Sequence, residues 1–260
     1  MSQLRVSLVQ SRLRWRDPAR NREHLAAQMN GVSGADLFVF PETFTTGFLG
    51  EKPETDEDMD GPTVAWLGAE ARDRKAAICG SAVIRDAAGR RNRFLFAAPD
   101  GQLEFYDKRH LFSFAGEDRR YVAGNDRVVF EHRGWRICPQ ICYDLRFPVW
   151  CRSRDDYDLL IFVANWPAPR INAWDTLLRA RAMENHCYGV AVNRVGEDGR
   201  GRAYPGHSAI YDPLGDTVIA PWQSVGCRAP VMDLDRVREI RTDFPFAAEA
   251  DSFSLDSGSR

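Results

Sequence analysis

The stretch of residues 137–148 combines an apolar, strand-like run with a polar turn, and Cys142 stands where the run ends. This order predicts a thiol held at the end of a strand, where a substrate can reach it. Two other strand-like runs are followed by groups that such a thiol needs, Glu42 and Lys108. A carboxylate can act as a general base, and an ammonium group can stabilise an oxyanion. Together the three side chains predict nucleophilic attack by a cysteine on a carbonyl carbon.

Each of these residues also has an ordinary structural interpretation. Cys142 alone could be a buried packing thiol, because free cysteine is among the most buried residue types. Glu42 could cap the turn that follows it, and Lys108 could be a solvated surface lysine. The catalytic interpretation requires the pKa of Cys142 to fall from about 8.5, and Lys108 or a helix starting near Phe147 could lower it.

Two competing chemistries find less support in the sequence. His110 is a rival base for a cysteine–histidine enzyme, but no Asn or Asp stands at a recognisable position to complete a papain-like arrangement. Cys138 and Cys142 could form a metal pair, yet no second pair follows and the nearest downstream histidine is His186. We therefore expect no metal site at these cysteines. The remaining cysteines are expected to be reduced packing thiols rather than members of a disulfide framework: Cys79, Cys151, Cys187 and Cys227.

Strand and helix patterns alternate along the chain and would position these groups. Asp17 followed by Pro18 is typical of a helix start. Helices are predicted over residues 17–30, 61–74, 173–185 and 236–241. Strands are predicted over residues 4–10, 35–40, 76–84, 93–98, 102–106, 127–131, 136–141, 157–163, 187–193, 208–212, 217–220 and 225–233. This mixture, without a linker-like stretch, predicts one layered α/β domain with sheets inside and helices outside.

Composition excludes several classes of function. The 260 residues carry a formal net charge of -2 and no block of like charges. Binding to nucleic acid or to a membrane surface therefore has no electrostatic support. No apolar run approaches the roughly 20 residues that span a bilayer. The first ten residues alternate like a strand and lack the features of a signal peptide, which favours a cytoplasmic location.

Three segments resemble the catalytic motifs of the nitrilase superfamily, in the same order and with similar spacing. They are Pro41-Glu42-Thr43-Phe44, Asp107-Lys108-Arg109-His110-Leu111-Phe112 and Ile141-Cys142-Tyr143-Asp144-Leu145-Arg146-Phe147-Pro148. The resemblance runs from about Leu4 to Phe246. It includes Gly116-Glu117, residues 163–170, residues 179–185 and residues 193–196. These additional segments are most similar to the bacterial omega-amidase branch.

The resemblance implies a single-domain, four-layer αββα sandwich over residues 1–246, usually assembled as a homodimer. Residues 247–260 would be a polar tail that is frayed or contacts the partner subunit. In this family Cys142 would be the nucleophile, Glu42 the general base and acid, and Lys108 the oxyanion donor. Glu117 would orient the site, and the backbone N–H of Tyr143 would be a second oxyanion donor.

The same resemblance implies hydrolysis of the terminal amide of alpha-ketoglutaramate or alpha-ketosuccinamate through a thioester. This mechanism requires no metal and no organic cofactor. Such a small-molecule substrate carries a carboxylate, which favours binding by arginine. The candidate substrate-binding residues are Phe44, Arg146, Asn165, Trp166, Arg170 and Arg181. Two alternatives stay open: an amidase for another substrate, such as deaminated glutathione or an N-carbamoyl amino acid, and a non-catalytic interaction module on the same fold.

Overall fold

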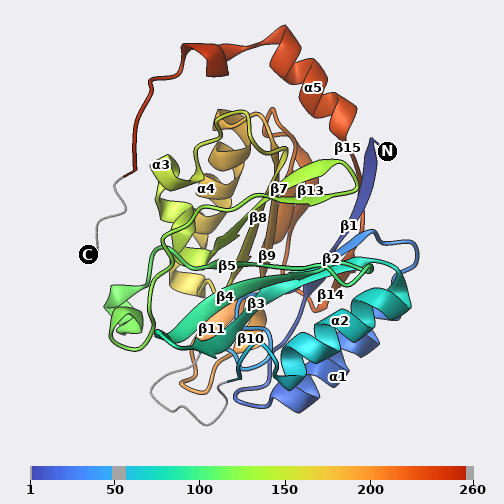
Figure 1. Cartoon of the computed structure of the whole chain (residues 1–260), viewed down its shortest axis with the longest axis vertical. Helices are drawn as coiled ribbons and strands as arrows, with labels where there is room; N and C mark the ends of the chain where they lie inside the picture. Colours follow the sequence, from blue (N-terminus) through green and yellow to red (C-terminus); the bar gives the residue numbers. More distant parts are fainter. Residues whose placement is uncertain (1, 49–56, 256–260) are drawn as a thin grey trace.

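The computed structural model describes residues 2–48 and 57–255 and contains two main β-sheets (Figure 1). The first sheet consists of β1 (Gln3–Gln10), β2 (Leu37–Val39), β3 (Ala77–Asp86), β4 (Gly89–Ala97), β5 (Leu103–Asp107), β14 (Gly226–Arg228) and β15 (Val231–Asp233). The second consists of β6 (Phe130–His132), β7 (Trp135–Ile141), β8 (Leu159–Ala164), β9 (Tyr188–Asn193), β12 (Ser208–Tyr211) and β13 (Thr217–Trp222). A separate hairpin joins β10 (Val195–Glu197) to β11 (Ala203–Pro205).

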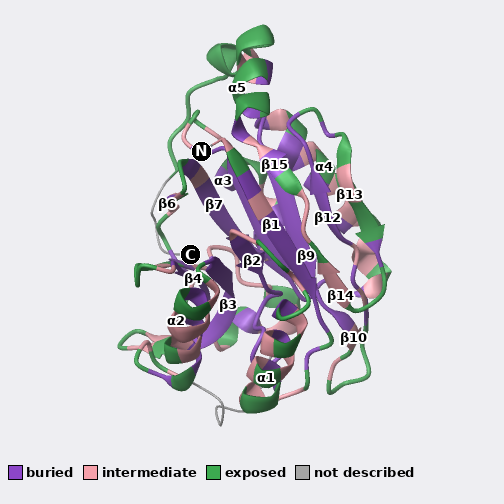
Figure 2. Ribbon diagram, turned by 90° about the vertical axis from the view of Figure 1, so that its right-hand side faces the viewer, coloured by how far each residue is buried: buried purple, intermediate pink, exposed green. Residues whose placement is uncertain are grey.

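Helices cover the outer faces of the two sheets. The helices are α1 (Pro18–Met29), α2 (Pro62–Arg74), α3 (Pro148–Cys151), α4 (Ile171–Glu184) and α5 (Leu234–Asp243). Helices α1 and α2 pack on the first sheet, and α4 packs on the second. The purple central strands in Figure 2 lie between helices whose outer sides are green, that is, exposed. The expected αββα sandwich is thus confirmed.

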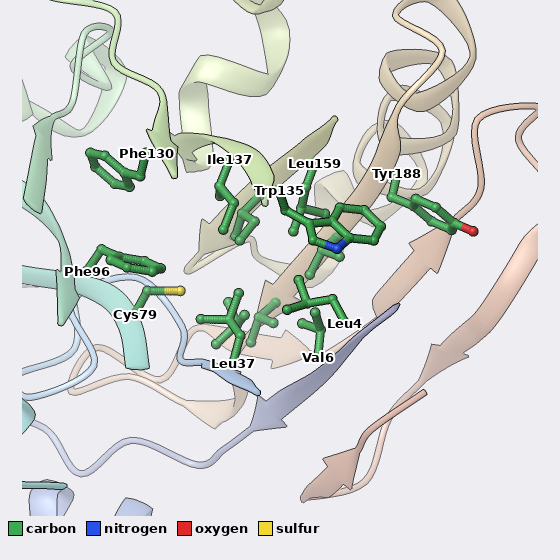
Figure 3. Close-up of a cluster of buried hydrophobic side chains, with 14 of the residues drawn as sticks. Leu4, Val6, Leu37, Cys79, Phe96, Phe130, Trp135, Ile137, Leu159 and Tyr188 are labelled. Atoms are coloured by element: carbon green, nitrogen blue, oxygen red, sulfur yellow. The ribbon is translucent and has the colours of Figure 1, made fainter. Parts of the chain in front are cut away.

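The alternating side chains of the strands supply both an inner and an outer core. In β1, Leu4 and Val6 belong to the core between the sheets, whereas Val9 faces the outer helices. Successive residues of a strand point to opposite faces, so a strand that is covered on both sides reads as a continuous apolar run. Figure 3 shows the inner core, where Leu37 of the first sheet and Trp135 of the second contribute to one cluster.

Most of the predicted elements are present with small shifts at their ends. Asp17 caps α1 by accepting a hydrogen bond from the backbone N–H of Arg20 at 3.2 Å. The single strand predicted over residues 225–233 is instead two strands, β14 and β15, which both pair with β1. Pro230 lies between them and has no N–H to donate to a sheet, which accounts for the break. The hairpin β10–β11 was not predicted.

After α5 the chain crosses one end of the molecule (Figure 1). There the guanidinium of Arg154 lies 5.1 Å from the ring centroid of Phe253 and donates to its carbonyl oxygen at 3.3 Å. The last part of the predicted polar tail, residues 256–260, lies outside the described residues. Within the described ranges, every helix is too short or too polar to cross a membrane, and no group of three or more side chains has the arrangement of a metal site.

Candidate active site

Cys142 occupies a strained turn at the end of β7. Its φ is +46°, a left-handed conformation that a residue with a Cβ adopts only at a cost. A short 3₁₀ helix, η3 (Cys142–Arg146), begins there and leads into α3. Because β7 and β8 run parallel, the ends of both strands meet at one edge of the second sheet. The turn therefore presents the thiol at that edge, as the sequence indicated.

Asp144 holds this turn against the segment that carries Lys108. Its fully buried carboxylate accepts hydrogen bonds from the backbone N–H of Ile141 at 3.0 Å and from that of His110 at 2.9 Å. The hydroxyl of Tyr106 donates to the same carboxylate at 2.8 Å. The Asp144 side chain thus links Tyr106 and His110, which lie on either side of Lys108 in the sequence, to the turn that carries Cys142.

His110, the rival base, lies in this supporting structure. Its Nδ1 is 2.8 Å from Asp144, and its ring stacks on Phe147 with 3.6 Å between the centroids. It does not line the pocket that contains Cys142. The ring therefore packs behind the turn rather than facing a substrate.

Lys108 forms the centre of a buried charge cluster. Its Nζ lies 2.9 Å from Glu42 Oε1 and 3.1 and 2.9 Å from the two oxygens of Glu117. Asn92, on β4, donates from Nδ2 to Glu42 Oε1 at 2.8 Å and to Glu117 Oε1 at 3.2 Å. The four side chains are at most 1% exposed, so these contacts act with little screening by water.

Asn165 holds Glu42 from the opposite sheet. Its backbone N–H donates to Glu42 Oε2 at 2.7 Å, and its Nδ2 donates to the Glu42 carbonyl oxygen at 2.9 Å. Asn165 follows β8 in the second sheet, whereas Glu42 follows β2 in the first. The Glu42 carboxylate of the first sheet is therefore held in place by a residue of the second.

The thiol of Cys142 is held neutral in this environment. Burial raises its pKa well above the usual value, and the charges of Glu42 and Glu117 and a hydrogen bond to Glu42 raise it further. Lys108 lowers the pKa but does not outweigh these effects. The expectation that Lys108 or the following helix depresses the pKa of Cys142 is thus wrong. The hydrogen bond to Glu42 instead suits removal of the proton during attack.

The partners of the thiol have shifted pKa values as well. Burial alone would lower the pKa of Lys108, but the charges of Glu117 and Glu42 raise it well above its usual value. Burial raises the pKa of Glu117, Lys108 opposes this, and Glu42 adds to it. Lys108 therefore stays an ammonium group, as an oxyanion donor must.

A pocket opens above the thiol and is lined by aromatic and basic side chains. Its floor is formed by Glu42, Lys108 and Cys142. Of the predicted substrate-binding residues, the lining includes Arg146, Asn165, Trp166 and Arg170, together with Tyr143, the proposed second oxyanion donor. It also includes residues that were not predicted: Phe48, Phe112, Pro167, Arg202 and Tyr204.

Two predicted substrate-binding residues lie away from this pocket. Phe44 is fully buried in the outer core, where its ring centroid is 5.2 Å from that of Phe40. Arg181 is 4% exposed and donates to the carbonyl oxygen of Leu145 at 2.8 Å, which fastens α4 to η3. Phe44 packs among apolar side chains, and Arg181 binds a backbone carbonyl and Glu184, so neither contributes to the lining of the pocket.

The sequence matches the family model for carbon-nitrogen hydrolases over residues 5–242. The chain belongs to the carbon-nitrogen hydrolase family. It is 44% identical over 256 residues to omega-amidase YafV of Escherichia coli K12, covering 98% of this chain and 100% of that protein. It is 34% identical to the 2-oxoglutaramate amidase of Bacillus subtilis, covering 81% of this chain and 83% of the relative.

A solved structure of the same family agrees closely. XC1258 from Xanthomonas campestris, described as a CN-hydrolase superfamily protein with an arsenic adduct in its active site, superposes with a TM-score of 0.96. It is 49% identical and the match covers 98% of this chain and 100% of that one. As a member of the carbon-nitrogen hydrolase family with amidase relatives, the protein is a hydrolase that acts on carbon–nitrogen bonds.

Proposed function

We propose that the protein hydrolyses the terminal amide of small dicarboxylic keto-acid monoamides, such as alpha-ketoglutaramate and alpha-ketosuccinamate. The observation that carries the proposal is the convergence of the Cys142 thiol, the Glu42 carboxylate and the Lys108 ammonium on the floor of one pocket. The names of the relatives, omega-amidase and 2-oxoglutaramate amidase, support this substrate class.

In the first half of the reaction, Cys142 is acylated. Glu42 takes the thiol proton as Sγ forms a bond to the amide carbon, and the carbonyl π electrons move to oxygen. The ammonium of Lys108 and the backbone N–H of Tyr143 stabilise this oxyanion, and each such donor typically contributes about 3 to 4 kcal/mol. Glu42 then gives its proton to the nitrogen, the carbon–nitrogen bond breaks, and ammonia leaves a thioester on Cys142.

In the second half, the thioester is hydrolysed. Glu42, again a carboxylate, takes a proton from water while the water oxygen bonds to the thioester carbon. The same donors stabilise the second oxyanion. The carbon–sulfur bond then breaks, Sγ regains the proton from Glu42, and the carboxylic acid leaves. Each cycle consumes one water and returns every protein group to its starting state.

The positioning of Glu42 is the part of this scheme that the structure supports most directly. A proton shuttle must serve the sulfur, the leaving nitrogen and the water in turn, so its carboxylate must not rotate away between steps. Asn92 and Lys108 hold Oε1, and Asn165 holds Oε2. Glu117 supports the arrangement through Lys108 and Asn92.

Replacement of the nucleophile tests the proposal. C142A should reduce ammonia release from alpha-ketoglutaramate to the background rate, since no thioester can form. C227A, which alters a half-buried cysteine on β14 outside the pocket, should retain wild-type turnover. A trapped thioester on the wild-type protein, observed by mass spectrometry after acid quench, is expected at Cys142 alone. Full activity of C142A would refute the assignment.

A substrate panel separates the proposal from its alternative within the family. Deaminated glutathione and N-carbamoyl amino acids should give a lower kcat/KM than alpha-ketoglutaramate. If either gives the highest value, the protein is an amidase for that substrate instead. A non-catalytic interaction module is disfavoured, because the complete cluster of Glu42, Lys108 and Cys142 is present and the relatives are amidases.

The proposal also includes a homodimer in the cytoplasm, with residues 247–260 as a tail outside the catalytic domain of residues 1–246. The family resemblance supports this arrangement. Sedimentation of the full chain should give twice the 29.5 kDa mass of one chain. A chain ending at residue 246 should retain turnover, and weaker association of that variant would place the tail at the subunit contact.

A further inference from the structure

The catalytic pocket carries three positive charges that no acidic side chain neutralises directly. Arg146, Arg170 and Arg202 all line it. Within the part of the chain that the structure describes, none of their guanidinium groups forms an ion pair or donates a hydrogen bond to a protein atom. Two of them rest on aromatic rings: Arg146 lies 5.0 Å from the Trp166 centroid and Arg170 lies 5.1 Å from the Phe112 centroid.

The charges also act on one another. Arg170 is half-buried. Burial lowers its pKa, and the positive charges of Arg202 and Arg146 lower it further. A guanidinium remains charged in proteins despite such shifts. Three like charges around one small pocket repel each other, and a bound anion would relieve that repulsion. The positive charges of the pocket thus favour binding of a negatively charged ligand.

Asp198, in the loop between β10 and β11, is an acidic side chain near these charges, and it is already engaged. Among the described residues, Asp198 Oδ1 accepts from the backbone N–H groups of Arg200 at 2.9 Å and Arg202 at 3.0 Å. Its Oδ2 accepts from the Tyr204 hydroxyl at 2.9 Å. These bonds fix the hairpin loop while leaving the Arg202 side chain directed to the pocket.

Arg170 and Arg202 stand where the pocket meets a second, outer cavity. Both residues line both cavities, as do Phe48 and Phe112, whereas Arg146 lines the inner pocket alone. A carboxylate between Arg170 and Arg202 would therefore lie at the mouth, with the rest of a short substrate extending toward Cys142 on the floor. That orientation directs the opposite end of the molecule, the amide, at the nucleophile.

We propose that Arg170 and Arg202 bind the free carboxylate of the substrate and restrict the enzyme to amides with net negative charge. This inference deepens the proposed function and rests on it. Two guanidinium groups can bind one carboxylate through charge-assisted hydrogen bonds. The ligand class is the monoamide of a short dicarboxylic acid that carries no ammonium group beside the bound carboxylate.

This arrangement explains why a keto acid would be preferred to the corresponding amino acid. Glutamine has the same terminal amide and the same carboxylate as alpha-ketoglutaramate, but its alpha-ammonium would approach the two arginines. Like charges brought together at a binding site are strongly unfavourable. We expect kcat/KM for glutamine to be at least about 100-fold below that for alpha-ketoglutaramate.

Single charge removals test the assignment. R170Q and R202Q should each raise KM for alpha-ketoglutaramate about 10- to 100-fold, the usual effect of losing a hydrogen bond to a charged group, with a smaller change in kcat. R170K and R202K should recover part of the loss. The matched control is R200Q, in the same hairpin loop. Arg200 lines the outer cavity but not the inner pocket that contains Cys142, and KM should change less than about twofold.

A neutral substrate gives a second readout. Pentanamide lacks the carboxylate, so the wild type should hydrolyse it far more slowly than glutaramate, and R170Q and R202Q should not slow it further. The proposal is overturned if the two variants behave like R200Q, or if the wild type hydrolyses pentanamide as well as glutaramate. Thermal unfolding of each variant shows whether it is folded. If a glutamine variant does not fold, the corresponding lysine variant is used in its place.

Protection of Cys142 separates this proposal from the proposed reaction. Glutarate should slow alkylation of Cys142 by iodoacetamide at about pH 9 in the wild type and in R200Q, but not in R170Q or R202Q. If glutarate protects in this pattern while no amide is hydrolysed, the reaction is wrong and the carboxylate site stands. If alpha-ketoglutaramate is hydrolysed but R170Q and R202Q match R200Q in KM and in protection, the carboxylate site is wrong and the reaction stands.

Discussion

Asn92 offers the sharpest test of how the charge cluster works, because Asp is nearly isosteric with Asn. The Asn92 amide donates to Glu42 and Glu117 at 2.8 and 3.2 Å. An ionised carboxylate there would stand about 4 Å from each of two carboxylates and near one ammonium. At an effective dielectric constant of about 20, each such pair is worth about 4 kcal/mol, so two repulsions and one attraction leave about 4 kcal/mol of net repulsion.

That repulsion corresponds to a rise of about three pKa units, from about 4 to about 7, for the new carboxyl group in N92D. A carboxyl group with a raised pKa is protonated below that value, where its O–H can replace one of the lost donors. Above it, the group is ionised and repels Glu42. The ratio of kcat for N92D to kcat for the wild type should therefore be highest near pH 6 and should fall as pH rises through about 7.

The assay is ammonia release from saturating alpha-ketoglutaramate between about pH 5.5 and pH 9, with thermal unfolding followed at the same pH values. N92L removes the donors at every pH and should lower kcat about 10- to 100-fold without a pH trend in the ratio. N30D, at the exposed end of α1, is the control. A ratio for N92D that is flat across this range would refute the view that Asn92 positions Glu42 through these bonds.

Two further predictions concern the core and the thiol. F44A should lower the free energy of unfolding by about 3 to 5 kcal/mol, since the ring is fully buried, while KM of the folded enzyme stays within about twofold of wild type. A rise in KM without loss of stability would instead indicate that Phe44 contacts the substrate. Because the pKa of Cys142 is raised, the rate of its alkylation by iodoacetamide should be low at pH 7 and should increase through pH values above about 9. Mass spectrometry measures this rate at Cys142. A rate that already reaches its plateau below about pH 8 would contradict the neutral thiol.

The sequence was most informative where a pattern and a local rule agreed. Helix α1 follows from the Asp17 cap and Pro18 at the first helical position. The strands β7 and β8 follow from apolar runs that are buried on both faces. The grouping of Glu42, Lys108 and Cys142 followed from residue types placed after strands and from resemblance, and the structure brings the three side chains together.

The substrate pocket was harder to predict, because sequence does not show which way a side chain after a strand points. Phe44 and Trp166 both follow strands, yet one packs in the outer core and the other lines the pocket. Arg202 lies in a glycine-rich stretch without a strand pattern, so the hairpin β10–β11 was missed. Asn92 was missed because a lone Asn between two arginines carries no periodic signal.

The pKa of Cys142 could not be inferred from nearby charges in the sequence. Lys108 is close, as expected, but two carboxylates and the loss of hydration outweigh it. The sign of the shift depends on the balance of three nearby charges and on burial, which only the folded arrangement supplies.

The bonds from Asn165 to Glu42 join two layers of the sandwich at the reacting groups. Turnover therefore reports on the alignment of one sheet over the other, because a slip of about one ångström can cost about 100-fold in rate. A cavity opened far away, at Leu37 or Trp135 in the inner core, would disturb this alignment before the chain unfolds. During gradual heating, the enzyme should lose activity while its circular dichroism spectrum is still that of the folded protein.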